Sequence, residues 1–511
     1  MNIQTTQHTI MNLTRRNFLK TAAMGAAAFS FDARSWSRAA GANSDIRVAV
    51  IGLRSQGVGH IKTLSRMNGV RLVALCDVDR QVLEAKAKEL GGGVQTFADI
   101  RKLLDSKDVD AVSIAMPNHW HALATVWACQ AGKDVYVEKP ASHNLFEGRK
   151  MVEAARKYKR IVQCGTQCRS SVGLQEAVKY VRDGHLGRIL LARGFCYKAR
   201  KSIGTVDGPQ PVPDYIDYDL WCGPARNEPP RRNGSFGPVH YDWHWFWDYG
   251  NGDYGNQGPH QVDIARWFLG ENAIAPFSQA IGGRLGYQDS AETPNTLIVY
   301  HGYKTPLLFE VRGLPRDKAS QSEGWKMDSY KGVGVGNVIE CENGYVVVPS
   351  YTEAIIYDKD GKEVTRFDGK KKGKADTVST PLGLSAESGG HHGNWIAAVR
   401  SRDPKALRAE ILEGHLSAGL VHTGNISYRL GARKAPGEIR ESLADHKGMA
   451  EAFDRMAGHL EVNGVDITTD KVQLGVPLRF NPRKERFVDN AQANEMSSRD
   501  YRSPFVVPAK V

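Results

Sequence analysis

Residues 46–77, IRVAVIGLRSQGVGHIKTLSRMNGVRLVALCD, decide the fold of this chain. The stretch contains an apolar run, Arg47–Ile51, then a turn with glycines and a helical pattern, then a second apolar run, Arg71–Leu75, that ends before Asp77. Apolar runs separated by a helix-length segment are typical of parallel strands joined by crossover helices. The stretch therefore predicts the first strand–helix–strand unit of an α/β domain.

The turn after the first apolar run has the features of a dinucleotide site. Gly52 and Gly57 take the first and third glycine places of G-x-G-x-x-G, and Arg54 replaces the middle glycine. Such a site needs a tight turn, backbone N–H groups that face the pyrophosphate, and a helix N-terminus behind them. We assign five residues of the turn to the cofactor site: Gly52, Arg54, Ser55, Gln56 and Gly57.

Asp77 follows the second apolar run, twenty residues after Gly57. A carboxylate there can accept hydrogen bonds from both ribose hydroxyls of NAD and would repel the 2′-phosphate of NADP. Asp77 therefore indicates NAD, with NADP as the alternative. The alternative is a purely structural role, in which Asp77 caps the N-terminus of the helix that begins near Arg80.

The same alternation continues and predicts a doubly wound parallel sheet, the Rossmann fold, over residues 43–170. We expect further strands at Ala111–Ala115, Asp134–Val137 and Ile161–Gln163, and helices at Gln81–Leu90, Asp99–Leu104, Ala122–Ala131 and Phe146–Tyr158.

Extended segments dominate after residue 170, following one more helix at Ser171–Gly184. Asn343-Gly344 and Asp360-Gly361 lie between apolar runs and predict hairpins. Residues 171–440 are therefore predicted to form an α+β domain on a large, mostly antiparallel open sheet, with helices at Gln261–Leu269, Asn394–Arg400 and Ala406–Leu420. Residues 441–511 are predicted to be a C-terminal extension. Because an open sheet has a face to cover, we expect a homo-oligomer that forms through it.

Three further motifs lie where an open parallel sheet presents its ligands or in the domain beyond. They are Pro117-Asn118-His119-Trp120-His121, Glu138-Lys139-Pro140 and Gly258-Pro259-His260-Gln261-Val262-Asp263. With the glycine turn, they resemble the Gfo/Idh/MocA family (glucose–fructose oxidoreductase, inositol dehydrogenase, rhizopine catabolism), and in particular its exported branch. The resemblance is close over residues 45–170 and looser beyond.

The resemblance implies roles for single residues. Lys139 matches the lysine between cofactor and substrate, His260 matches the histidine that moves the substrate proton, and Asn118 and His121 match positions that line the nucleotide. Glu138 and Gln167 are assigned to the cofactor site with them.

Family dehydrogenases usually carry an aspartate where this chain has Asn256, and an amide cannot take up a proton. We assign catalysis to Lys139, His260 and Asn256. The structural alternatives are a surface lysine before a proline and a histidine at a helix start.

A long loop region, residues 202–258, is rich in proline, glycine and aromatic residues. Its centre, residues 240–249, reads HYDWHWFWDY. Interleaved aromatic rings, carboxylates and histidines suit a carbohydrate, and we assign Asp242, Trp243 and His244 to the substrate. The alternative is a loop that packs its own aromatic residues. His240 and His244 have metal-like spacing but no evident third ligand, so we expect no metal.

The first 42 residues resemble a twin-arginine signal peptide. Thr14-Arg15-Arg16-Asn17-Phe18-Leu19-Lys20 is followed by a short apolar stretch and by Ala40-Gly41-Ala42. We therefore expect a periplasmic or other extracytoplasmic protein with no membrane-spanning segment after cleavage. The seven cysteines show no framework spacing, although one disulfide remains an alternative outside the cytoplasm.

The charge of +12 does not indicate a nucleic-acid partner, because four of these charges lie in residues 1–42 and many of the others in one loop, residues 370–374.

Three functions follow, in order of preference. The first is an NAD(P)-dependent oxidoreductase that acts on a sugar or polyol and keeps its nucleotide bound, because an exported protein meets no cytosolic NAD pool. The second is a redox-neutral glycosidase or lyase that works through transient oxidation at C3 with bound NAD. The third is a non-catalytic sugar-binding protein.

Overall fold

The computed structural model describes residues 45–369, 390–469 and 471–511. The predicted signal peptide, residues 1–42, and the lysine-rich loop, residues 370–374, lie outside the described residues. Among the described helices, none is long and apolar enough to cross a membrane. All seven cysteines lie within the described residues and are buried and unpaired, so the structure does not contain the alternative disulfide.

The nucleotide domain is built on a six-stranded parallel sheet with the order β3-β2-β1-β4-β5-β6. This is the strand order of doubly wound dinucleotide-binding sheets, and the predicted fold class is confirmed. The strands are β1 Ile46–Ile51, β2 Val70–Cys76, β3 Gln95–Phe97, β4 Ala111–Ile114, β5 Asp134–Val137 and β6 Val162–Cys164.

Helices cover both faces of this sheet. One face packs against α3 Gln56–Leu64, α4 Arg80–Glu89 and α12 Gly390–Ser401, and the other against α5 Ile100–Leu104, α6 Asn118–Gln130 and α7 Leu145–Lys157. Helix α12 comes from far along the chain, and its Trp395 is fully buried against the sheet. The folded nucleotide domain therefore includes a helix that begins 220 positions beyond residue 170, where the sequence predicts the end of this domain.

The second domain is built on a twelve-stranded sheet whose main path runs β14-β13-β12-β11-β7-β10-β9-β8-β16-β15. Its neighbouring strands are antiparallel, except that β7 and β10 are parallel. The strands are β7 Ile189–Tyr197, β8 Phe277–Gly283, β9 Thr296–His301, β10 Leu307–Arg312, β11 Val335–Cys341, β12 Gly344–Val348, β13 Glu353–Tyr357, β14 Glu363–Asp368, β15 Ala432–Lys434, β16 Val472–Leu474, β17 Leu478–Asn481 and β18 Arg486–Phe487.

Side chains alternate between the two faces of this sheet, as β7 shows. Ala192 and Cys196 pack on the inner face with α8 Val172–Arg182, α11 Gly258–Leu269 and α13 Ile411–Arg429, whereas Leu191 packs on the outer face with α15 Lys447–Val462. The helix predicted at Ala406–Leu420 is α13, which begins at Ile411 and continues to Arg429. The remaining short helices are η1 Gln167–Ser170, α9 Tyr218–Cys222, η2 Asp242–Trp245, α10 Gly252–Asn256, η3 Ala319–Gln321, η5 Pro404–Ala406, α14 Pro436–Ser442 and α16 Ala491–Glu495.

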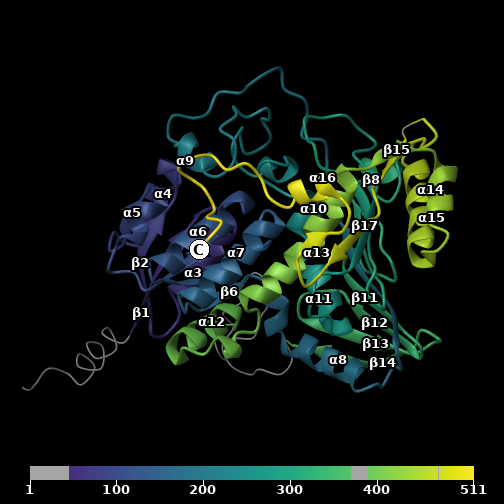
Figure 1. Cartoon of the computed structure of the whole chain (residues 1–511), viewed down its shortest axis with the longest axis horizontal. Coiled ribbons are helices and arrows are strands. Elements are labelled where there is room, and N and C mark those ends of the chain that lie inside the picture. The colour runs from purple at the N-terminus through teal and green to yellow at the C-terminus, as the bar shows by residue number, and fades with distance from the viewer. Residues whose placement is uncertain (1–44, 370–389, 470) are drawn as a thin grey trace, which may run out of the picture.

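The aromatic loop, defined here as residues 202–250, lies over the end of β2 in the nucleotide domain. The Arg80 N–H donates to the Tyr215 carbonyl at 2.9 Å, and the Asp217 N–H donates to the Val78 carbonyl at 3.1 Å. The C-terminal tail, residues 497–511, runs from α16 to the region of α9 and ends beside α6, as the yellow trace shows (Figure 1). Arg502 of this tail binds Asp219 of the aromatic loop at 2.6 Å. The tail therefore contacts both the nucleotide domain and the aromatic loop.

Candidate active site

The glycine turn between β1 and α3 has the shape that a nucleotide needs. Gly52 has φ +84°, and a Cβ on it would lie 2.6 Å from the Ala115 carbonyl oxygen. A Cβ on Gly57 would lie 1.9 Å from the Gly52 carbonyl oxygen, so glycine alone fits at both places. Helix α3 begins at Gln56 without a side-chain cap from Ser55, although the Gly57 N–H donates to the Arg54 carbonyl at 2.8 Å. An uncapped helix start of this kind can accept an anion.

Asp77 and Asp79 hold the backbone around this turn. The Asp77 carboxylate accepts the Leu53 N–H at 2.8 Å and the Asp79 N–H at 2.9 Å. Burial raises the pKa of Asp77, although these two backbone hydrogen bonds act in the opposite direction. Asp77 thus lies beside the glycine turn, where its assignment to the ribose remains a prediction.

Arg54 is paired with Asp79, and its assignment to the cofactor site stays a prediction. Arg54 donates to Asp79 Oδ2 at 2.8 Å, and His240 of the aromatic loop donates to the same oxygen at 3.0 Å. Burial raises the pKa of the Asp79 carboxyl, but the hydrogen bonds from His240 and Arg54 outweigh it and bring the pKa to about 2. Asp79 therefore links Arg54 of the glycine turn with His240 of the aromatic loop.

Asn118 and His121, at the start of α6, are both buried. Asn118 donates to Asn251 Oδ1 at 3.1 Å. The two ring nitrogens of His121 face the Pro140 and Met116 carbonyl oxygens, each at 2.7 Å, so this ring ties together the segments that follow β4 and β5. Its ring nitrogens are engaged by the backbone, and its contacts position the segment that carries Lys139.

Glu138 is buried in a chain of hydrogen bonds that the sequence did not reveal. Ser113 faces His60 Nδ1 at 3.0 Å, and His60 Nε2 faces Glu138 Oε1 at 3.2 Å. Glu138 Oε2 accepts the Lys139 backbone N–H at 3.2 Å. Burial opposes ionisation of Glu138, but the hydrogen bond from His60 lowers its pKa to about 2. His60 could have been suspected from sequence only as a polar residue on the apolar face of α3.

The structure brings Lys139 and Asn256 together from the two domains. Lys139 Nζ donates to the Asn256 backbone oxygen at 2.7 Å and approaches its Oδ1 at 3.3 Å. Burial lowers the pKa of Lys139. The ammonium group therefore has amide oxygens around it where a carboxylate would have formed an ion pair.

His260 lies one turn beyond Asn256, at the start of α11, and its side chain is buried. Burial and, after it, the nearby charge of Lys139 lower the pKa of His260 to about 3. The ring packs beside Tyr351 with centroids 4.8 Å apart, and its Nδ1 has no hydrogen-bond partner among the described residues. A neutral imidazole with a free nitrogen can accept a proton.

The residues predicted to bind substrate separate into two groups. His244 stacks on Trp243 with centroids 3.7 Å apart, and burial followed by the charges of Lys139 and Arg200 lowers the His244 pKa to about 3. Asp242 is buried within the loop, where a Cβ on Gly234 would lie 1.7 Å from its Oδ2. His244 therefore lies near Lys139, whereas Asp242 packs inside the aromatic loop.

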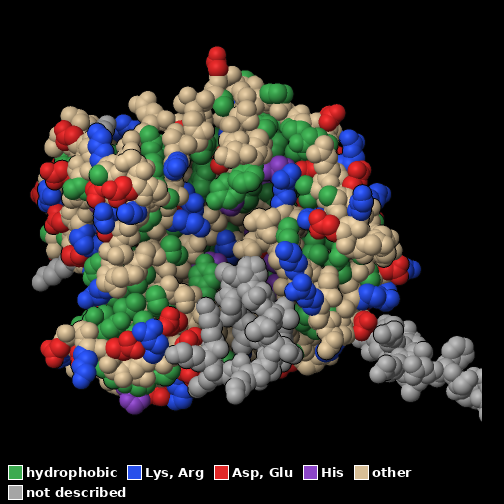
Figure 2. All heavy atoms as spheres, turned by 180° about the vertical axis from the view of Figure 1, so that it is seen from behind, with side chains coloured by type: hydrophobic (Ala, Val, Ile, Leu, Met, Phe, Trp, Pro, Cys, Tyr) green, Lys and Arg blue, Asp and Glu red, His purple; other side chains and the backbone are tan. Residues whose placement is uncertain are grey.

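The described residues fit a dinucleotide. The glycine turn leads into the start of α3, which has no side-chain cap from Ser55, and Gln167 and Thr166 hold buried side-chain oxygens, Oε1 and Oγ1, that have no hydrogen-bond partner among the described residues. Unpaired buried oxygens of this kind can accept from an amide or a hydroxyl of a bound group. Seen from behind, basic and histidine side chains lie between the two lobes, next to hydrophobic ones (Figure 2).

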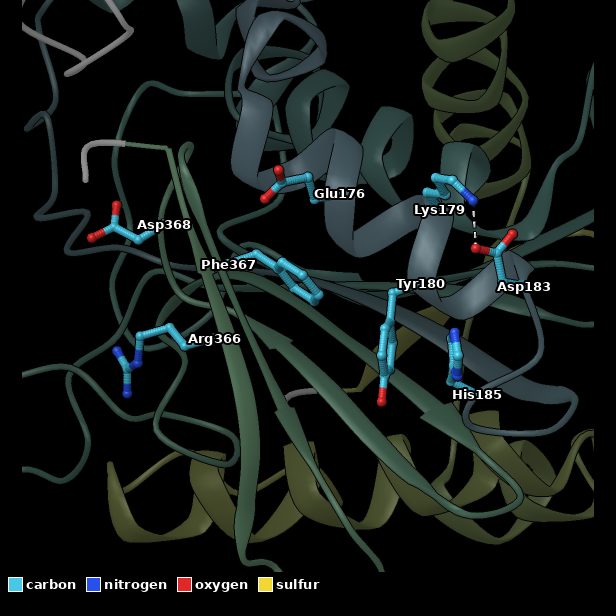
Figure 3. Close-up of a pocket in the computed structure, with 8 residues that line it drawn as sticks. All are labelled: Glu176, Lys179, Tyr180, Asp183, His185, Arg366, Phe367 and Asp368. Atoms are coloured by element: carbon cyan, nitrogen blue, oxygen red, sulfur yellow. Dashed lines mark hydrogen bonds and ion pairs between the residues drawn. The ribbon is translucent and has the colours of Figure 1, made fainter. Parts of the chain in front are cut away.

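An open groove of about 540 Å³ lies elsewhere, between α8 and β14 (Figure 3). Tyr180 stacks on His185 with centroids 4.3 Å apart, and Phe367 lies against the other side of Tyr180. None of the residues that line this groove is among the predicted site residues.

Two models of one protein family match consecutive parts of the chain. The first, GFO_IDH_MocA, is described as an oxidoreductase family with an NAD-binding Rossmann fold and matches residues 46–166. The second, GFO_IDH_MocA_C2, is described as the C-terminal alpha/beta domain of the oxidoreductase family and matches residues 172–321. Together they cover just over half of the chain.

Curated relatives match over shorter stretches. A "Glycosyl hydrolase family 109 protein" of Shewanella pealeana is 30% identical over 210 residues, which are 35% of this chain and 45% of that protein. "Inositol 2-dehydrogenase 3" of Saccharopolyspora erythraea is 34% identical over 151 residues, which are 29% of this chain and 44% of that protein. The chain spans about half the length of the curated relatives it matches.

Solved structures share the fold at low identity. The WlbA dehydrogenase of Bordetella pertussis, in complex with NADH and UDP-GlcNAcA, aligns with a TM-score of 0.53 at 20% identity and covers 75% of this chain and 97% of that one. Levoglucosan dehydrogenase, in complex with NADH and levoglucosan, aligns with a TM-score of 0.54 at 16% identity and covers 74% of this chain and 95% of that one. From the two family models, the chain belongs to the GFO_IDH_MocA oxidoreductase family.

Proposed function

We propose that this protein is an NAD-dependent oxidoreductase that acts on a secondary alcohol of a sugar or polyol. The observation that carries the proposal is the meeting of Lys139, at the end of β5, with Asn256 and His260, which belong to the second domain. Oxidation of an alcohol needs a hydride acceptor, a base for the hydroxyl proton and a positive charge beside the developing oxyanion. The inositol dehydrogenases among the relatives support this class of reaction.

The chain's own residues divide this chemistry between them. The nicotinamide, when bound, accepts a hydride from a substrate carbon. The neutral imidazole of His260 takes the hydroxyl proton through the free Nδ1. The Lys139 ammonium stabilises negative charge on the substrate oxygen, and Asn256 holds Lys139 in place through its two oxygens. Glu138 and His60 keep the backbone of Lys139 fixed from beneath.

We also propose that the nucleotide stays bound throughout turnover. The aromatic loop closes over the segment after β2, next to Asp77, and the Asp79–Arg54–His240 contacts fasten it there. Such a nucleotide would be recycled in place, by a second sugar or by return of hydride to the first substrate. NAD rather than NADP is favoured because Asp77 would repel a 2′-phosphate.

The nucleotide is tested by denaturing the purified protein and assaying the supernatant for NAD(H) and NADP(H). We expect about one NAD(H) per chain without any added nucleotide. Lys139→Met should retain the nucleotide but lose its reduction by sugars. An empty wild-type protein that works only with added NAD would disprove tight binding, and unchanged turnover in Lys139→Met would show that Lys139 does not take part in the chemistry. A wild-type protein that binds sugars but never reduces a nucleotide would favour a non-catalytic sugar-binding protein.

A redox-neutral glycosidase or lyase is the second candidate. It is supported by Asn256 in place of an aspartate and by the glycosyl hydrolase family 109 relatives. Oxidation at C3 passes a hydride to the nucleotide and acidifies the neighbouring C–H, a base removes that proton, and the leaving group departs. In a glycosidase water then adds in its place, and in either case the hydride returns from the nucleotide to C3. Release of an aglycone with no net change in the nucleotide favours this candidate, whereas a stable keto-sugar favours net oxidation.

We propose export through the twin-arginine route from the motif at residues 14–20. A reporter fused behind residues 1–42 should be exported, and replacement of Arg15 and Arg16 by lysine should stop export.

Self-association is a separate proposal. The outer face of β8, β9 and β10 is already covered by α15 within one chain, so a dimer through this sheet would use the outer face of β12 and β13, where Tyr345 and Tyr357 stack at 5.0 Å. Light scattering during gel filtration measures the mass.

A further inference from the structure

Lys198 follows directly after β7 and lies on the inner face of the sheet. Alternation along the strand puts Ala192, Gly194 and Cys196 on this face, and a Cβ on Gly194 would lie 2.9 Å from Gln261 Cβ of α11. The Lys198 N–H still donates to the Arg312 carbonyl at 3.0 Å, so the extended backbone continues through it. Lys198 therefore points to the side of the sheet on which α11 holds His260.

Two carboxylates that act electrostatically on Lys139, Asp253 and Glu138, already have partners. Asp253 binds Arg200 through two hydrogen bonds of 2.6 and 2.7 Å, and Glu138 is engaged by His60 and the Lys139 backbone. The Lys198 ammonium, in contrast, has no hydrogen bond or ion pair within the described residues. The site thus contains an unneutralised positive charge besides Lys139.

Two electrostatic effects agree with this placement. The charge of Lys198 lowers the pKa of Lys139, after the larger effects of burial and the opposing effect of Glu138. The charges of Lys139, Arg200 and Lys198 also lower the pKa of His244, after burial. Lys198 is therefore close to the lysine assigned to the chemistry and to the histidine of the aromatic loop.

We propose that the substrate is an acidic sugar, a uronic or aldonic acid or its glycoside, and that Lys198 binds its carboxylate. This inference rests on the proposed function, because it places the reacting alcohol beside Lys139 and His260. One unpaired ammonium balances one carboxylate, whereas a phosphate dianion calls for two charges or an arginine fork. The sugar's hydroxyl end faces Lys139, and its acid end faces Lys198.

The test compares carboxylated sugars with their neutral counterparts in the full-length protein. Reduction of the bound nucleotide is followed by fluorescence with glucuronate against glucose, galacturonate against galactose, and the matching sugar phosphates. We expect kcat/KM for an acid to exceed that for its neutral partner in the wild type. Lys198→Gln should reduce this ratio by roughly 10- to 100-fold, the effect of losing one charge-assisted hydrogen bond.

Lys201→Gln is the matched control, because Lys201 is an exposed lysine three residues further on that lies over the Trp325 ring. It should leave the ratio unchanged. In the wild type, the ratio of kcat/KM for an acidic sugar to kcat/KM for its neutral counterpart should also fall as the salt concentration rises.

Three results would overturn the proposal: a wild type that prefers neutral sugars or sugar phosphates, a wild type with no response to any carboxylated sugar, or an equal loss of the ratio in both lysine variants. Failure of the proposed function is distinguishable, because it would appear as a protein without nucleotide or as a Lys139→Met variant with full turnover. If the protein oxidises neutral sugars and this activity depends on Lys139, the proposed oxidoreductase function stands and only the proposal of an acidic substrate fails.

Discussion

Position 256 decides how the side chain of Lys139 is held. With asparagine there, Lys139 meets two amide oxygens at 2.7 and 3.3 Å and no carboxylate, so burial lowers its pKa without a strong opposing ion pair from this helix. An aspartate at the same place would favour the charged form of the lysine.

Asn256→Asp should therefore raise the pKa of Lys139. We expect the limb of the pH–rate profile that belongs to Lys139 to move up by about one unit or more, since an opposite charge at this distance shifts a pKa by about 1–3 units. The measurement is the pH dependence of nucleotide reduction under single turnover. Asn256→Ala is the control and should produce no upward shift; an unmoved profile in Asn256→Asp would show that the limb belongs to another group.

At the scale of elements, the contact between the aromatic loop and α4 depends on Asp79. This carboxylate is fully buried, caps α4 through the Val82 N–H at 3.1 Å, and accepts from Arg54 and His240. Asp79→Asn removes the negative charge that binds both partners. It should weaken the contact between the aromatic loop and the nucleotide domain by about 1–3 kcal/mol, a figure that allows for the partial exposure of Arg54.

We expect Asp79→Asn to release its nucleotide under native conditions at least tenfold faster than the wild type. Filtration of the folded protein at intervals, followed by assay of the filtrate, measures this rate. Asp108→Asn is a suitable control, because Asp108 is exposed and pairs only with surface side chains. Equal retention in the wild type and Asp79→Asn would show that the loop does not hold the nucleotide.

A buried carboxyl group at the start of α7 should make the stability of the protein depend on pH. Glu147 is fully buried beside Tyr501 of the tail, and burial raises its pKa to about 7. A carboxyl whose folded pKa lies above its unfolded value contributes full stability below about pH 4.5, and this contribution is lost as the pH rises through about 7.

Glu147→Gln should remove that dependence. At pH 8 the free energy of unfolding of the variant should exceed that of the wild type by up to about 3 kcal/mol, reduced by the cost of losing a hydrogen-bond acceptor. At pH 4.5 the variant should gain nothing. Denaturant unfolding at the two pH values measures the difference. A difference that is equal at both pH values would assign the effect to packing.

At the scale of the whole molecule, the C-terminal tail joins the nucleotide domain to the aromatic loop. Phe505 is 1% exposed and packs on Trp120 with centroids 5.5 Å apart, while Arg499 donates to the Asp248 carbonyl at 2.8 Å. The tail thus connects α6 with the aromatic loop at Asp219 and Asp248.

Phe505→Ala should destabilise the protein by about 3–5 kcal/mol, as expected for a buried phenylalanine, and should also speed nucleotide release. Val506→Ala is the neighbouring control, since Val506 is 44% exposed and should change neither quantity appreciably. Thermal unfolding and the filtration assay measure the two effects. Loss of stability without faster release would confine the tail to a structural role.

The amino-acid sequence by itself determined the local units of this protein. Gly52 and Gly57 imply the turn because no larger residue fits there, and the apolar runs around them predict β1, α3 and β2. The motif with Lys139 and the motif with His260 likewise identified two residues that the structure places near each other.

Only the tertiary structure decided how distant parts meet. Asn256 supplies its oxygens to Lys139 from 117 residues away, His60 reaches Glu138 across 78 residues, and α12 returns to cover the nucleotide sheet. The pairing of Arg54 with Asp79 and the inward burial of Asp242 also depend on the folded loop. The physical reason is that a local pattern specifies backbone geometry and which faces are apolar, whereas the partner of each face is chosen by packing across the whole chain.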